Sequence, residues 1–153
     1  MIVRLVRDRI LLIAQPDHAH VARTIMESCV PLAARPRRDA ILHAIGEHDN
    51  GWAEEDAAPI VDPETGSVGD FARLPPPLAF CTASPDAQRF GAWTVQPSGT
   101  RIVVTPDVFG GATIPIEINA REIRRHTFRS DADLRHALSE ANTTTLRGEV
   151  AGH

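Results

Sequence analysis

The sequence predicts an α+β fold in which an N-terminal β-hairpin and an antiparallel helix pair are followed by a small antiparallel β-sheet with one C-terminal helix. Three patterns indicate this fold class. Two short runs of apolar, largely β-branched residues open the chain at 2–6 and 10–14. Apolar residues then recur at three- and four-residue steps over 17–29 and 36–49, as on the buried face of a helix. From residue 93 onward, several short segments have the composition and alternation of strands.

The composition is that of a globular protein with no general attraction to nucleic acid. The chain has 153 residues, of which 42% are hydrophobic and 24% charged, and its formal net charge is −4. This charge and the small share of aromatic residues, 5%, argue against binding to nucleic acid or to an anionic membrane. No apolar stretch approaches the roughly 20 residues of a membrane helix, and the N-terminus does not resemble a signal peptide. We therefore expect a cytoplasmic protein with no nucleic acid and no membrane among its partners.

The first part of the chain is expected to form the hairpin and both paired helices. The first helix should begin near Asp17, whose negative charge suits a first helical turn, and should end at Pro31. The second should begin after Pro36 and end at about Asp49, because Asn50-Gly51 is a typical helix stop. Only a few residues join the two helices, so we expect them to pack antiparallel.

The middle of the chain differs in composition from both ends. Residues 57–90 are rich in proline and glycine without periodicity, which predicts an irregular connection in which Pro75-Pro76-Pro77 is a stiff extended spacer. We expect a single compact domain over 1–153. Its sub-regions would be a helical part at 1–56, the Pro-rich connection at 57–90 and a β-rich part at 91–150.

The β-rich part should contain several strands and one helix. Residues 93–95 and 101–105 are strand candidates separated by a Pro-Ser-Gly turn. Isoleucines alternate with other residues over 113–118, and Pro115 among them argues for an edge strand. The further elements expected are a turn at Asn119-Ala120-Arg121, a strand ending near Phe128, a helix capped by Ser130 and a last strand over 143–150.

Two histidines and an aspartate are expected to meet at one end of the helix pair. His18 lies in the first turn of the first helix, and His48 and Asp49 lie in the last turn of the second. In an antiparallel pair these ends are neighbours, and both histidines fall on the apolar, partner-facing side. Further polar residues close by in the chain are Gln15, Asp17 and His20.

The side chains of this group suit a metal or acid–base site. Imidazole nitrogen and carboxylate oxygen are ligands of zinc, manganese and iron, and a bound metal lowers the pKa of its water. Without a metal, His48 and Asp49 could act as general acid and base, because histidine titrates near neutral pH. The alternative is structural, since a histidine on an apolar helix face is commonly a hydrogen-bonded core residue. Asp49 could likewise bond backbone amides of the turn that follows, and Trp52 could either line a pocket or fill the core.

Several spaced motifs also resemble a known family. They are, in order, residues 1–4, 15–19, 48–52, 56–59 and 62–66. Through them the chain resembles the bacterial domain-of-unknown-function family DUF3891, whose members are similar to the HD superfamily of metal-dependent phosphohydrolases. The resemblance is specific over roughly the first half and looser from about residue 80 to 150. It implies that the helix pair is HD-like and that His18, His48 and Asp49 hold a divalent transition metal such as zinc, manganese or iron.

The chain departs from the family pattern in its middle. Family members are longer and carry additional helices there, one of them with a further histidine, so this chain resembles a short variant without the middle helices. The absent ligand could be replaced by Asp56, Asp62 or His126, or by a group from a second chain. The shortened helical part also leaves apolar helix faces with little cover, which suggests homo-oligomers.

Three functions from different classes follow from these residues. The first is a metal-dependent hydrolase that acts on a small phosphorylated or anionic substrate, with an active or degenerate site. The second is a non-catalytic binding or self-associating scaffold domain in which the histidines and aspartate hold the helix pair together. The third is a metal-free pocket that binds a small anion through His18, His20 and neighbouring arginines.

Overall fold

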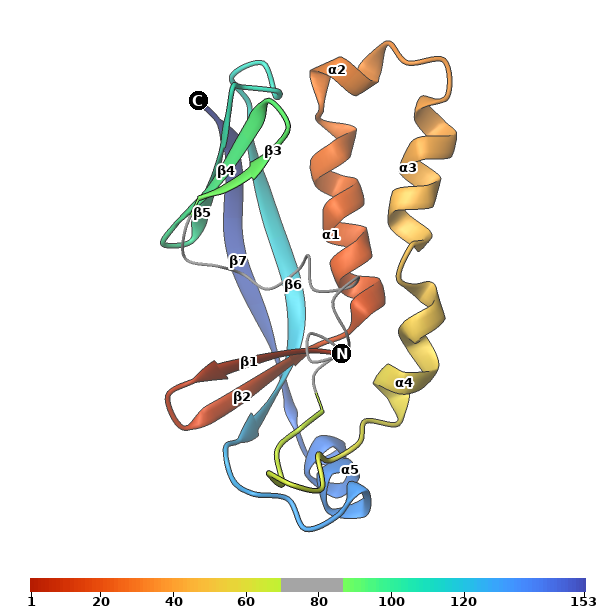
Figure 1. The fold of residues 1–153 in the computed structure, drawn as a ribbon, viewed down its shortest axis with the longest axis vertical. Helices are drawn as coiled ribbons and strands as arrows, with labels where there is room; N and C mark the ends of the chain where they lie inside the picture. Colours follow the sequence, from red (N-terminus) through yellow and green to blue (C-terminus); the bar gives the residue numbers. More distant parts are fainter. Residues whose placement is uncertain (70–86) are drawn as a thin grey trace. The chain divides into compact units, whose positions relative to one another are not determined.

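The computed structural model describes residues 1–69 and 87–153, which form two compact units (Figure 1). Unit 1 comprises 1–18, 49–69 and 119–145, and unit 2 comprises 19–48, 87–118 and 146–153. Each unit is therefore assembled from stretches that are distant in sequence. The expected Pro75-Pro76-Pro77 spacer lies outside the described residues.

Seven strands, five α-helices and one 3-10 helix are present in the described part of the chain. The strands are β1 (Ile2–Val6), β2 (Arg9–Ile13), β3 (Gln88–Phe90), β4 (Trp93–Ser98), β5 (Arg101–Thr105), β6 (Thr113–Arg124) and β7 (Asn142–Gly152). The helices are α1 (Gln15–Glu27), α2 (Val30–Ala33), α3 (Arg38–Glu47), η1 (Asn50–Trp52), α4 (Ala53–Ala57) and α5 (Asp131–Ser139). The strands are hydrogen-bonded in the order β1-β2-β6-β7-β5-β4-β3, and the β5–β7 pair is parallel.

The expected fold class is wrong. We expected an HD-like helical part followed by a small antiparallel sheet, whereas the protein is mixed α/β with seven strands in one hydrogen-bonded order. The N-terminal hairpin is not separate from the C-terminal strands, because β2 pairs with β6 and places Ile10 opposite Ile123. Residues 10–13 of β2 are all buried, so this strand needs a partner beyond β1 and cannot remain an apolar sheet edge.

The core of unit 1 connects the hairpin to the C-terminal helix. Leu134 of α5 is completely buried and belongs to one apolar cluster with Ile10 and Leu12 of β2. The Oγ atom of Ser130 accepts a hydrogen bond from the backbone N–H of Asp133 at 3.2 Å, which confirms the predicted helix cap. The cap and the buried face together position α5 against the strand that leads into α1.

Unit 2 contains two apolar clusters. One consists of Cys29, between α1 and α2, with Leu32 of α2 and Leu42 of α3, and Figure 1 shows α1 and α3 running side by side in opposite directions. Gly46 of α3 faces the Arg23 side chain of α1, since a Cβ atom at Gly46 would lie 3.0 Å from Cδ of Arg23. The second cluster consists of Phe109, Ile114 and Val150 with their partly buried neighbours.

Two expected helix boundaries differ from the structure. Pro31 does not end the first helix, which stops at Glu27, but lies in the first turn of α2, where its missing N–H is not needed. Asn50-Gly51 does not end the helical path either, since η1 and α4 continue it to Ala57. None of the helices in the described residues is long and apolar enough to cross a membrane.

Strand β6 is longer than predicted. The turn expected at Asn119-Ala120-Arg121 does not form, because the alternation of buried and exposed residues continues through Ala120, which is 1% exposed. β6 is also internal in the strand order, although Pro115 argued for an edge. Strand β2 pairs only with residues 121–124 of β6, so the missing N–H of Pro115 costs no hydrogen bond to β2.

Candidate metal centre

His18, His48 and Asp49 lie where one helix begins and another ends. His18 is in the first turn of α1, and His48 follows the last residue of α3 with a helical backbone conformation, φ −63° and ψ −24°. Asp49 comes next and precedes η1. The chain thus continues in near-helical turns through the His48-Asp49 dipeptide, which holds both side chains between two ordered elements.

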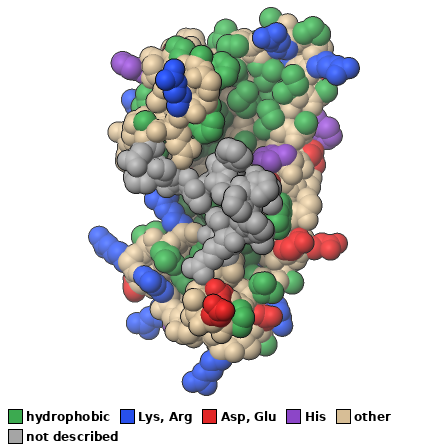
Figure 2. All heavy atoms as spheres, in the orientation of Figure 1, with side chains coloured by type: hydrophobic (Ala, Val, Ile, Leu, Met, Phe, Trp, Pro, Cys, Tyr) green, Lys and Arg blue, Asp and Glu red, His purple; other side chains and the backbone are tan. Residues whose placement is uncertain are grey.

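The three side chains converge. Nδ1 of His18 lies 3.1 Å from Oδ2 of Asp49, and each of the three residues offers one ligand atom within 4.8 Å of the others. The Asp49 side chain is 13% exposed and that of His18 is 33% exposed, whereas His48 is on the surface. Figure 2 shows histidine side chains at the surface beside the helices of unit 2. The group is therefore partly buried but open to small solutes.

The ring of His48 is oriented by the helix that carries it. Its Nδ1 lies 2.6 Å from the carbonyl oxygen of Ile45. Because a carbonyl oxygen can only accept, Nδ1 must be the protonated nitrogen, and Nε2 is then the nitrogen with a lone pair in the neutral ring. A backbone carbonyl that fixes the tautomer in this way is a common support for a metal-binding histidine.

Other residues expected near the site lie outside this group. Among the described residues, no further histidine, cysteine, aspartate or glutamate joins the three-residue cluster. Gln15 is buried at the start of α1, and Asp17 lines a separate cavity. His20 is exposed, and Trp52 is half-buried in η1.

The three residues considered as a replacement ligand have other roles. Asp56 of α4 is paired with the Met1 ammonium, and both groups are buried. Asp62 accepts two backbone N–H groups of the turn that follows it. The ring of His126 packs on Phe128 with a centroid separation of 4.2 Å. Within the described part of the chain, the cluster thus has three protein ligands.

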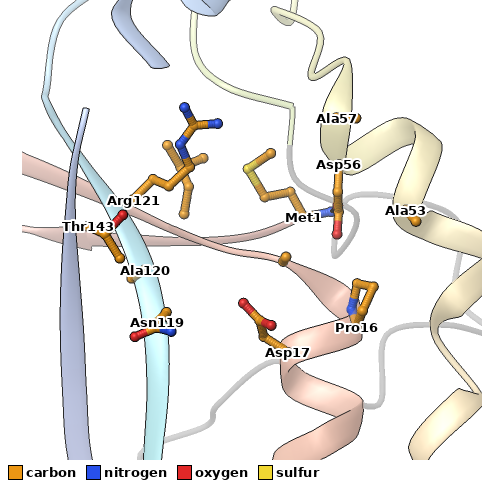
Figure 3. Close-up of a pocket in the computed structure, with 12 residues that line it drawn as sticks. Met1, Pro16, Asp17, Ala53, Asp56, Ala57, Asn119, Ala120, Arg121 and Thr143 are labelled. Carbon is orange, nitrogen blue, oxygen red and sulfur yellow. Dashed lines mark ion pairs between the residues drawn. The ribbon is translucent and has the colours of Figure 1, made fainter. Parts of the chain in front are cut away.

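A cavity in unit 1 contains polar residues that sequence reasoning missed. Its volume is about 400 Å³, and Asn119, Arg121 and Thr143 of β6 and β7 line it together with Asp17 (Figure 3). The predicted turn at 119–121 placed Asn119 and Arg121 outside any strand. The alternating pattern through Ala120 is the sequence signal that would have placed both residues on a strand.

Comparison with known proteins identifies the family of the chain. Residues 1–90, more than half of the sequence, match the family model described as "Protein of unknown function (DUF3891)". The chain belongs to the DUF3891 family. The DUF3891 match includes His18, His48 and Asp49, so the whole candidate metal centre lies within the family region. No curated protein and no solved structure matches the chain.

Proposed function

We propose that the protein binds a divalent transition metal through His18, His48 and Asp49 and hydrolyses a small phosphorylated or anionic substrate there. The observation that supports this proposal is the convergence of two imidazoles and one carboxylate at the junction of α1, α3 and η1. Two histidines and one carboxylate form a ligand set used for both zinc and non-haem iron. The proposal does not depend on an HD fold, which the protein lacks.

The spacing of one pair of donor atoms, on His18 and Asp49, suits a metal ion of this class, and the third donor atom, on His48, lies within 4.8 Å of both. With bonds of about 2.1 Å, adjacent ligand atoms lie about 3.0 Å apart in octahedral and about 3.4 Å apart in tetrahedral coordination. The 3.1 Å between Nδ1 of His18 and Oδ2 of Asp49 falls within this range. A metal bound by this pair would therefore replace their mutual hydrogen bond with little movement of either side chain.

The protein orients the side chains of His48 and Asp49 through contacts of its own. The Ile45 carbonyl holds His48 in one tautomer, and the largely buried Asp49 carboxylate accepts a hydrogen bond from His18. His18, His48 and Asp49 would hold the metal, which would supply a water of lowered pKa for hydrolysis. The exposure of His48 leaves room for a substrate on the solvent side.

The main alternative is a structural role for the same residues. The His18–Asp49 hydrogen bond joins the first turn of α1 to the start of η1, and this contact requires no metal. Exposed apolar side chains on α2 and α3, Val30 and Ile41, would suit a self-associating scaffold, and Figure 2 shows hydrophobic side chains over this helical region. This alternative predicts a loss of stability, rather than a loss of metal, when the cluster is altered.

The test compares His48→Ala with His43→Ala, since both histidines are exposed, His43 lies within α3 and His48 directly follows it, and only His48 belongs to the cluster. We expect zinc, manganese or iron to bind the wild-type protein and His43→Ala at one equivalent, and His48→Ala to bind at least about tenfold more weakly. Hydrolysis of bis(p-nitrophenyl) phosphate should follow the metal content. Equal metal affinity in the three proteins would refute the proposed site. Metal binding without hydrolysis of any phosphate ester would support the metal site but refute the proposed hydrolase activity.

A further inference from the structure

The cavity in unit 1 has the features of a second binding site, independent of the proposed metal centre. Strand β6, strand β7, the first turn of α1 and helix α4 surround its volume of about 400 Å³ (Figure 3). Much of its wall is apolar and is contributed by small side chains, among them Ala14, Ala53, Ala57 and Ala120. Cavities of this size with an apolar wall and a few polar groups are typical of sites for small molecules.

One of its two carboxylates is already neutralised within the protein. Asp56 is paired with the Met1 ammonium, and its Oδ2 accepts the backbone N–H of Gln15 at 2.5 Å. Its Oδ1 is buried and interacts with the ammonium by charge, without a hydrogen bond of normal geometry. Asp56 therefore contributes no net charge to a ligand in the cavity.

Two further charged side chains line the same cavity and are not neutralised. Asp17 on α1 is half-buried, and Arg121 on β6 is exposed; neither forms an ion pair within the described residues, with the other or with any third group. Arg121 is nevertheless held in place, because it donates a hydrogen bond to the backbone carbonyl of Leu138. That acceptor is uncharged, so the positive charge of the guanidinium stays available to a ligand.

We propose that this cavity binds a small zwitterion, a molecule that carries one ammonium and one carboxylate group as a free amino acid does. The ammonium would pair with Asp17, and the carboxylate with Arg121. Both side chains line the cavity and come from different elements, Asp17 from α1 and Arg121 from β6 (Figure 3). A ligand with both charges satisfies both groups at once, whereas a simple anion or a simple cation leaves one charged side chain facing it without a counter-charge.

The neutral polar groups of the cavity agree with this ligand class. The Asn119 amide and the Thr143 hydroxyl both line it, and each can donate or accept a hydrogen bond. The Asn119 carbonyl already accepts a hydrogen bond from the Thr145 hydroxyl at 3.0 Å, which leaves its two N–H donors for the carboxylate end of a ligand. The small apolar side chains that line the cavity then accommodate the carbon chain of the ligand.

The experiment uses the whole protein and a series of ω-amino acids with increasing chain length: glycine, β-alanine and γ-aminobutyrate. Butyrate and butylamine are the matched probes with a single charge. Affinities are measured by chemical-shift titration. We expect one member of the series to bind at least about tenfold more tightly than either single-charge probe, because it forms a second charge-assisted contact. The chain length of that member reports the distance between the two charges in the site.

Substitutions assign each end of the ligand. In Asp17→Asn, the zwitterion should bind no more tightly than butyrate. In Arg121→Gln, it should bind no more tightly than butylamine, whereas Arg121→Lys should keep part of its higher affinity over butylamine. The matched controls are Asp8→Asn and Arg124→Gln, exposed residues that do not line the cavity. Affinities for the zwitterions no better than for the single-charge probes in the wild-type protein would overturn the proposal, as would equal losses in the control variants.

Discussion

Asp49→Asn separates the two roles open to the candidate metal centre, because it removes a charge while keeping a hydrogen-bond acceptor. The asparagine carbonyl can still accept the His18 Nδ1–H group, so a structural contact would survive in weakened form. A charge-assisted hydrogen bond contributes about 1.5–3 kcal/mol when it is well shielded from water. Here His18 is 33% exposed and Asp49 13% exposed, so solvent screening reduces the expected loss to about 1 kcal/mol.

The measured quantities are the melting temperature without metal and the metal affinity. For a chain of this size, about 1 kcal/mol corresponds to a decrease of about 2–4 °C in melting temperature. The metal affinity should decrease by more than about 100-fold. Removing a residue that only hydrogen-bonds to a ligand lowers metal affinity by about 10–100-fold, and removing the ligand itself should lower it further. Asp39→Asn is the control, since Asp39 lies on α3 with a 98% exposed side chain and does not belong to the cluster. A loss of more than about 3 kcal/mol together with unchanged metal binding would refute this reasoning and favour the structural role.

Three further substitutions test the fold. Leu134→Ala should cost about 3–4 kcal/mol in urea denaturation, because this side chain is fully buried, whereas Leu5→Ala at 55% exposure should cost less than about 1 kcal/mol; similar losses would contradict the unit 1 core. Gly66→Ala should destabilise by about 1–3 kcal/mol, because φ is +62° and the new Cβ would clash with Cγ2 of Thr127; a neutral effect would contradict this close approach. Ser130→Ala should cost about 1 kcal/mol while Ser130→Asp restores stability, and an equal loss in both variants would argue against the cap.

Features that depend on local chain geometry were predictable from the sequence. The helical period and the short connection between the two N-terminal helices placed His18 near Asp49, and their side chains lie 3.1 Å apart. The cap at Ser130 and the acidic first turn that follows it located α5 in the same way. Each of these expectations concerns residues on one element or on two consecutive elements, where the spacing along the sequence determines which side chains meet.

Features that depend on strand pairing were not predictable in this way. The pairing of β2 with β6 joins residues as far apart in sequence as Arg9 and Arg124, and no periodicity within either strand specifies its partner. The buried run at 10–13 indicated a strand covered on both faces, but not what covered it. The cavity between Asp17 and Arg121 follows from the same long-range pairing, so it could not be found before the strand order was known.

The proposal of a metal centre is tested most directly by a crystal structure of the metal-loaded protein with data collected at the absorption edge of the metal. We expect one anomalous-difference peak within bonding distance of His18, His48 and Asp49, about 2.0–2.2 Å from one atom of each. We also expect Nε2 of His48 to be the coordinating nitrogen, because Nδ1 donates to the carbonyl oxygen of Ile45. A metal bound elsewhere, or a fully loaded crystal in which the His18–Asp49 hydrogen bond persists without a peak beside it, would contradict the proposed metal centre.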